Sequence, residues 1–219
     1  MTPLRILHKT RARMLLGAGL LVLAFTVQGQ QVAAEQATLP AACQSGCVSQ
    51  YGTVLGQTED GVKAYSNCRP ACVVFEPYHH EGTYTGIKWQ CVEYARRWLL
   101  REKGVVFGDV DTAADMWQVT SVTQPDGAGE RFWTGVLNGA DAPPMVGDVL
   151  IYGEAFEGTG HAAVVVRVDD KAQQLFVAEQ NYLNTKWPAD YARSVDYVAH
   201  KGRYWVLDSH LIGWKRLEQ

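Results

Sequence analysis

The stretch GIKWQCVEYARRWLL, residues 86–100, decides how the rest of this chain is interpreted. Its apolar and polar residues alternate as they do on an amphipathic helix. We expect this helix from about Gln90 to Lys103, because Gly104 is a typical stop signal. Cys91 stands at its beginning, apart from the other cysteines of the chain. That separation is the feature that the remaining sequence has to explain.

The composition indicates one globular domain that binds no nucleic acid. The chain has 219 residues, of which 47% are hydrophobic and 20% are charged. This length is sufficient for one domain with a proper core. The formal net charge is −3, whereas phosphate binding needs a basic surface.

The N-terminus has the pattern of a secretory signal. A basic segment precedes the short apolar run MLLGAGLLVLAFTV, residues 14–27, and small residues follow it. We expect a signal peptide at 1–34, cleaved after Ala34. The alternative is an uncleaved anchor, but the run is shorter than the roughly 20 residues that span a bilayer. The mature protein is then periplasmic or secreted, with no stable membrane anchor. Residues 35–50 are expected as a linker and 51–217 as the domain.

Four cysteines upstream form two C-x-x-x-C pairs. Export to an oxidising compartment favours disulfides over a zinc site, although the spacing allows both. The runs YGTVLG (51–56) and GVKAYSN (61–67) are expected to pair as a hairpin around QTED, which carries the first cysteine pair back to the second. Links between the pairs are therefore favoured, such as Cys43–Cys72 with Cys47–Cys68, but sequence alone leaves the connectivity open.

The rest of the chain indicates an α+β fold, a helix packed on an antiparallel sheet. A second helix is expected at 112–122, with Thr112 as its N-cap. Residues 76–86 are expected as a polar loop, and 131–147 as mostly loop. Strand patterns then follow at 148–153, 161–168, 174–180, 203–208 and 211–217.

A catalytic thiol needs a base and a group that orients the base. His161 opens the most apolar strand, just after the Gly-rich turn EGTG. If this strand pairs with the next across the turn at 169–173, His161 faces Asn181 and Ala163 faces Glu179. Glu179 is then one diagonal step from His161, within reach of its side chain. The simpler interpretations are a structural histidine and a solvated carboxylate.

Cys91 at a helix N-terminus suits a nucleophile, because the helix dipole and a nearby imidazolium both favour a thiolate. Its backbone N–H, with Gln90, would stabilise an oxyanion. The simpler interpretation is a buried apolar cysteine. Cys91, His161 and Glu179 together predict papain-like amide hydrolysis.

Several motifs resemble those of CHAP amidases, the cysteine- and histidine-dependent amidohydrolases and peptidases. They include KWQCVEYARRWL (88–99), TGHAAVV (159–165), VAEQN (177–181) and LIGW (211–214). The closer resemblance is to the amidase domain of glutathionylspermidine synthetase/amidase and of trypanothione synthetase. It extends from Tyr51 to Trp214.

The resemblance implies a papain-like CHAP fold with N-terminal helices packed on an antiparallel sheet. It also implies that Cys91 is the nucleophile, His161 the general base and Glu179 the orienting residue. Arg96 and Asn181 would lie near the substrate. No metal or organic cofactor is expected.

This sequence differs from that family by its signal peptide, its four paired cysteines and the lack of an ATP-dependent synthetase half, so we expect hydrolysis without synthesis. Three functions remain open. The first is hydrolysis of a small peptide–polyamine conjugate such as glutathionylspermidine. The second is hydrolysis of a peptidoglycan stem peptide. The third is no catalysis at all, in which case the domain is an interaction module.

Overall fold

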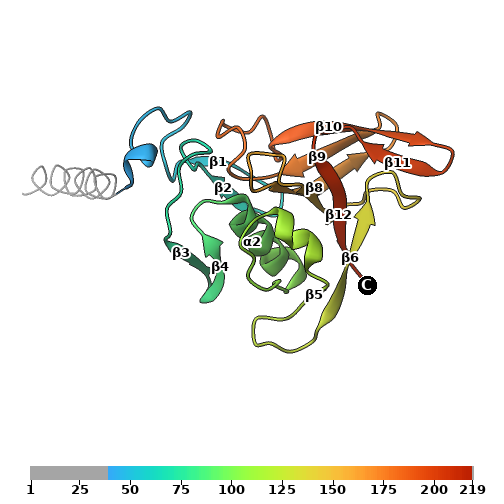
Figure 1. Ribbon diagram of the computed structural model, residues 1–219, viewed down its shortest axis with the longest axis horizontal. Coiled ribbons are helices and arrows are strands. Elements are labelled where there is room, and N and C mark those ends of the chain that lie inside the picture. Colours follow the sequence, from blue (N-terminus) through green and yellow to red (C-terminus); the bar gives the residue numbers. More distant parts are fainter. Residues whose placement is uncertain (1–38, 219) are drawn as a thin grey trace, which may run out of the picture. The chain divides into compact units, whose positions relative to one another are not determined.

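The structure, a computed structural model, describes residues 39–218, which are built around one eight-stranded antiparallel sheet. The strand order is β11-β10-β9-β8-β7-β12-β6-β5, so the last strand of the chain lies between β7 and β6 (Figure 1). Two hairpins, β1–β2 and β3–β4, stand outside this sheet. The bounds are β1 (Val54–Gln57), β2 (Lys63–Tyr65), β3 (Pro77–His80), β4 (Thr83–Ile87), β5 (Ser121–Val122), β6 (Arg131–Leu137), β7 (Val149–Tyr152), β8 (His161–Asp169), β9 (Gln174–Ala178), β10 (Arg193–His200), β11 (Arg203–Val206) and β12 (Leu211–Leu217).

The helix expected around Cys91 is present as α2 (Cys91–Lys103), the one α-helix between residues 39 and 218. Gln90 is its N-cap, and Gly104 ends it in the left-handed conformation that glycine adopts without strain. Tyr94 and Trp98 belong to its buried face. The helix contacts both β4 and β8, and it lies between the β3–β4 hairpin and the large sheet (Figure 1).

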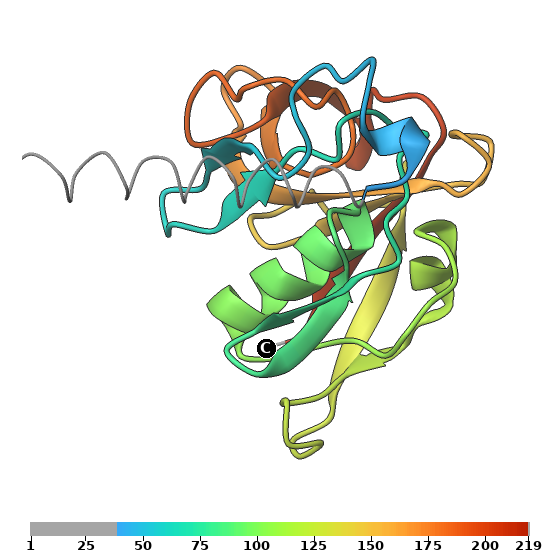
Figure 2. The ribbon, with the colours of Figure 1, turned by 90° about the vertical axis from the view of Figure 1, so that its left-hand side faces the viewer.

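The sheet has a hydrophobic core on each of its faces. On β8, Ala162 and Val164 pack with the buried face of α2. Ala163 and Val165 point the other way, into a second cluster whose buried members all come from β7–β12. Figure 2 shows part of this sheet end-on, with orange strands that curl strongly. Burial on both faces explains why strands such as Val149–Tyr152 are continuous apolar runs.

The expected helix at 112–122 is wrong. A 3-10 helix, η2 (Ala114–Gln118), occupies its first half and β5 its second. The expected N-cap is wrong too, because η2 is capped by Ala113, which makes no side-chain cap hydrogen bond. Thr112 lies one residue earlier, where the Asp115 N–H donates to its Oγ1 at 3.3 Å and its hydroxyl donates to Asp115 Oδ2 at 2.7 Å. The β-branched residues in 119–122 favour extended backbone and stop the helix. Several N-terminal helices were expected, and this is wrong: within residues 39–218 the structure has a single α-helix, α2.

Two segments that were expected as loops contain strands. Residues 76–86 form most of the β3–β4 hairpin, and 131–147 begins with β6. Both are largely polar or exposed, so their apolar pattern is weak; on β6 only Trp133 is fully buried. The five strands expected after residue 148 are confirmed, as is the α+β class.

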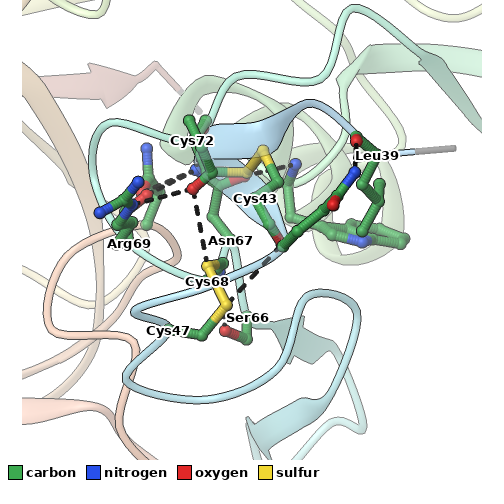
Figure 3. The surroundings of a disulfide bond; sticks show 12 residues. Leu39, Cys43, Cys47, Ser66, Asn67, Cys68, Arg69 and Cys72 are labelled. Carbon is green, nitrogen blue, oxygen red and sulfur yellow. Dashed lines mark hydrogen bonds between the residues drawn. A yellow bond between two sulfur atoms is a disulfide. The ribbon is translucent and has the colours of Figure 1, made fainter. Parts of the chain in front are cut away.

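The two disulfides pair Cys43 with Cys72 and Cys47 with Cys68. The connectivity favoured by the β1–β2 hairpin is thus confirmed. Both bonds lie close together and beside Asn67 (Figure 3). Three of the four cysteines are fully buried, and together with Leu39 they form a small core of their own.

Removal of the Cys43–Cys72 bond by Cys43→Ser with Cys72→Ser is expected to destabilise the fold by about 3–4 kcal/mol. The bond closes a loop with a sequence separation of 29 residues, and loss of that constraint restores chain entropy to the unfolded state. Denaturant unfolding of the oxidised protein measures the change. Cys91→Ser is the matched control, because the same atom is replaced in a cysteine that closes no loop. Equal stability of the two variants would contradict this role.

The expected signal peptide, residues 1–34, lies outside the described residues. Within the described part of the expected linker, Ala41–Cys43 forms the short helix η1. No helix in residues 39–218 is long and apolar enough to cross a bilayer.

Candidate active site

Cys91 is the first residue of α2 and the one cysteine that is free of a disulfide. Its side chain is 7% exposed and lines a cleft of about 610 Å³. Amide groups in the first turn of a helix lack intrahelical acceptors, and the positive end of the helix dipole lies there. Negative charge that develops beside Cys91 is therefore stabilised.

His161 and Glu179 are brought together by two neighbouring strands. His161 opens β8, and Glu179 follows the last residue of β9. The ladder pairs Val164 with Ala178, which is the expected register. His161 Nε2 and Glu179 Oε2 are 2.8 Å apart, and both side chains are buried. The contact expected from the hairpin is thus present.

Gly160 allows His161 to start its strand against β7. Its φ is +73°, and a Cβ on this residue would lie 2.3 Å from the carbonyl oxygen of Tyr152. Only glycine avoids that clash. The Gly-rich turn before His161 is therefore a requirement of local packing.

The side chains of Cys91, His161 and Glu179 interact electrostatically. Burial opposes a charged imidazole, but the charge and hydrogen bond of Cys91 and those of Glu179 outweigh it, so the pKa of His161 is raised to about 9. Burial also opposes the Glu179 carboxylate, yet its bond to His161 and the charges of His161 and Arg193 lower the pKa of Glu179. An ionised Glu179 therefore faces an imidazolium at neutral pH.

Arg193, which the sequence interpretation missed, donates from Nε to Glu179 Oε1 at 2.7 Å. It is the first residue of β10 and pairs with Val177 of β9. The signal that marks β10 is the alternation of buried Val195 and Tyr197 with exposed neighbours. If that strand had been recognised, its pairing with β9 would have placed Arg193 next to the end of β9, close to Glu179.

Gln90 and Asn181 are also brought to Cys91. Asn181 Nδ2 donates to Gln90 Oε1 at 2.8 Å, and Asn67 Nδ2 donates to Asn181 Oδ1 at 3.1 Å. Gln90 Nε2 lies 3.4 Å from both Asn67 Oδ1 and the Cys72 carbonyl oxygen. The disulfide-bonded segment in Figure 3 therefore borders the site through Asn67 and Cys72.

Arg96 lines the cleft, but its donors are already engaged. Its guanidinium donates to the carbonyl oxygens of Thr85, Phe107 and Gly108 at 2.8–3.0 Å. The side chain is 3% exposed and stacks on the ring of Phe107. In this arrangement Arg96 holds the wall of the cleft around residues 107–109, and it lies 3.4 Å from Asp109.

A buried ion pair fixes the segment that carries Glu179 and Asn181. Glu93 is fully buried, and Arg97 donates to its two oxygens at 2.6 and 3.1 Å. Gln180 Nε2 donates to the same carboxylate at 2.9 Å and to the Gln90 carbonyl at 3.2 Å. Gln180 thus ties the end of β9 to the start of α2, which fixes the distance between their side chains.

The lining of the cleft contains both apolar and acidic exposed residues. Val73, Phe75 and Tyr84 are partly or fully exposed apolar residues on one part of its lining, and Phe75 is 85% exposed. Asp109, Asp111 and Glu157 are exposed acids elsewhere in the lining. Residues 39–218 contain no group of three or more His, Cys, Asp or Glu side chains arranged to hold a metal ion.

Comparison with known protein families identifies the region that contains these residues. Residues 82–181 match the family model described as the CHAP domain. Residues 82–181 form a CHAP domain. Cys91, His161 and Glu179 lie inside the CHAP domain, whereas Arg193 and the disulfides lie outside the matched range.

The CHAP chain also has curated relatives. It is 33% identical to trypanothione synthetase of Crithidia fasciculata over 158 residues, which covers 72% of this chain and 24% of the relative. It is 30% identical to the bifunctional glutathionylspermidine synthetase/amidase of Escherichia coli (strain K12) over 180 residues, 75% of this chain and 29% of the relative. The chain thus spans about a quarter of the length of these relatives. The resemblance to a CHAP amidase domain of such enzymes is confirmed.

Proposed function

We propose that this CHAP protein is a cysteine-dependent amidohydrolase in which Cys91 is the nucleophile, His161 the acid and base, and Glu179 the orienting residue. The observation that carries the proposal is the buried 2.8 Å contact between His161 Nε2 and Glu179 Oε2, beside a cleft that both Cys91 and His161 line. Cys91 also acts electrostatically on His161 and raises the pKa of its imidazole. A relative whose name includes an amidase supports the reaction class. The α+β arrangement, helix before sheet, is consistent with a papain-like fold.

In the proposed reaction the Cys91 sulfur attacks the carbonyl carbon of the amide. The C–N bond then breaks as the His161 imidazolium gives its proton to the leaving amine, which leaves a thioester on Cys91. A water molecule, deprotonated by His161, attacks the thioester and releases the carboxylic acid and the thiol. Glu179 stabilises the imidazolium before the amine leaves and again after His161 has taken the proton of water.

Gln90 and the backbone N–H of Cys91 are proposed as the oxyanion donors. Asn181 holds the Gln90 side chain through the bond to its Oε1. The Gln90 Nε2 group makes two long contacts of 3.4 Å, to Asn67 Oδ1 and the Cys72 carbonyl oxygen, and an oxyanion would have to replace one of them. Asn181 also lines the cleft and is proposed to contact substrate. The part proposed for Arg96 is to hold the cleft wall at residues 107–109, since direct binding of a substrate carboxylate would compete with its three carbonyl partners.

The proposed substrate is an amide between a peptide and a polyamine, such as glutathionylspermidine. The homology to a glutathionylspermidine synthetase/amidase over 75% of this chain supports it. Asp109, Asp111 and Glu157 in the cleft lining suit a cationic leaving amine, because opposite charges attract it to the cleft.

We also propose that the domain, expected at 51–217, works outside the cytosol. The two disulfides support this, because such bonds persist in oxidising compartments. The expected periplasmic or secreted location and the signal peptide at 1–34 belong to the same proposal.

Glu179→Gln is expected to move the alkaline limb of kcat/KM to lower pH. In the wild type the imidazolium is lost as pH rises through about 9, the raised pKa of His161. The substitution removes a carboxylate that raises this pKa, while burial, which lowers it, remains. The pH profile of kcat/KM measures the limb, and Glu154→Gln, an exposed acid, is the control. An unmoved limb in a folded Glu179→Gln protein would contradict the orienting role.

The test of the function is product analysis by mass spectrometry with glutathionylspermidine and with purified peptidoglycan, for the wild type and Cys91→Ala. We expect glutathione and spermidine from the first substrate with the wild type only. Release of muropeptide fragments instead would assign a cell-wall substrate. No product from either substrate, with a folded wild type, would count in favour of a silent interaction module.

A further inference from the structure

Arg193 donates to both carboxylate oxygen atoms of Glu179, one of which also contacts His161. Its Nε donates to Glu179 Oε1 at 2.7 Å and its Nη2 to Glu179 Oε2 at 3.3 Å. His161 Nε2 lies 2.8 Å from that same Oε2. The carboxylate is therefore held at both oxygen atoms by the guanidinium, and such two-point pairs of arginine and carboxylate are among the strong hydrogen-bonding arrangements.

The guanidinium is itself fixed by three other groups. Arg193 Nη1 donates to Asp208 Oδ2 at 2.7 Å, and Nη2 donates to the Tyr152 hydroxyl oxygen at 3.0 Å. The Tyr152 hydroxyl donates to the same Asp208 oxygen at 2.8 Å. The ring of Tyr182 lies 4.4 Å below the guanidinium. This is a closed network and not a loose surface ion pair, so it can determine where Glu179 points.

The charges around Glu179 show when Arg193 matters most. In the proposed reaction His161 gives its proton to the leaving amine. Glu179, which is 3% exposed, then loses the imidazolium charge at its side. A buried carboxylate without a partner is strongly unfavourable, and Arg193 is the cation that stays.

We propose that Arg193 is a positioning residue that keeps Glu179 ionised and directed at His161 throughout the catalytic cycle. It does not line the cleft, so it acts through Glu179 and not on the substrate. The inference rests on the proposed function for its kinetic readout, but not for the chemical readout given below. The titratable or charged groups near Glu179 come from every element around it: His161 of β8, Arg193 of β10, Tyr152 of β7, Cys91 and Tyr94 of α2, Asp208 after β11, and Tyr182, three residues after Glu179.

The kinetic test compares Arg193→Met and Arg193→Lys with the wild type. We expect Arg193→Met to lower kcat by roughly 10- to 100-fold, the size known for the outer partners of metal-binding histidines, with KM little changed. Arg193→Lys keeps the charge but not the two-point pairing, so its kcat is expected between the two. Arg167→Met is the matched control, because Arg167 is an exposed arginine paired with Asp190 on the same sheet.

The chemical test needs no substrate. The rate of Cys91 alkylation by iodoacetamide is measured against pH in the same four proteins. Removal of the Arg193 charge raises the pKa of Glu179, so Glu179 takes up a proton at higher pH and no longer supports the imidazolium. The acid limb is the range in which the alkylation rate falls as pH decreases. We therefore expect it at higher pH in Arg193→Met and near the wild-type position in Arg193→Lys.

The results separate this inference from the function. A wild type without amidase activity, but with the expected shift in alkylation, would overturn the proposed substrate and retain the role of Arg193. An Arg193→Met protein that matches Arg167→Met in both kcat and acid limb would overturn the inference. Thermal unfolding accompanies both measurements; if Arg193→Met does not fold, Arg193→Lys and Asp208→Asn decide, and wild-type kcat and acid limb in both would overturn it.

Discussion

Cys91→Ala is expected to reduce kcat/KM for the amide substrate by at least about 10⁴-fold, because removal of the nucleophile leaves only binding and oxyanion stabilisation. The fold is expected to remain, since the side chain lines the cleft and removal of one sulfur atom opens no new cavity in the core. Turnover is measured by product release, and thermal unfolding confirms that the variant is folded. A folded Cys91→Ala protein with a few per cent of wild-type activity would exclude a thioester on Cys91.

His161→Gln is expected to reduce kcat/KM by about 10³- to 10⁴-fold, the size typical of the loss of one member of a catalytic triad. Glutamine cannot accept the thiol proton or deliver one to the leaving amine. The same substitution should slow alkylation of Cys91 at neutral pH, since the imidazolium that favours the thiolate is gone. Both rates are measured on the same protein preparation.

His200→Gln is the control for this substitution, because His200 is an exposed histidine on β10. It is expected to match the wild type in both rates. Loss of activity in His161→Gln without any change in alkylation would contradict a Cys91–His161 pair, and would indicate instead that His161 acts only on the substrate.

The residues of the site could be predicted where the evidence is local in the sequence. Cys91 could be singled out as a candidate nucleophile because it begins a predicted helix and stands apart in the sequence from the paired cysteines. The His161–Glu179 contact was predicted from simple pairing of a single hairpin, which holds near the site, where Val164 pairs with Ala178. Next to the turn the pairing is shifted by one residue, and an irregularity between Val165 and Arg167 separates the two registers. The β1–β2 hairpin favoured links between the two cysteine pairs, but which cysteine meets which was left open and is known from the structure.

The parts that the sequence did not predict depend on contacts between distant segments. β12 inserts between β7 and β6, and no local pattern states that order. Arg193 meets Asp208 only because β10 and β11 bring their ends together, and Arg96 gives its donors to carbonyl groups of residues 85, 107 and 108. An arginine on a helix looks the same in sequence whether it binds a substrate or the backbone, so its partner can be known only from the fold.

The most direct test of the central claim is the inactivation of the oxidised protein by iodoacetamide, with intact-mass and peptide mass spectrometry at each time point. The other four cysteines are held in disulfides, so one reactive thiol is available. We predict that one alkyl group is added per chain, that it maps to Cys91, and that amidase activity falls at the same rate, more slowly when substrate is present. A fully alkylated protein that still hydrolyses the amide would contradict the account.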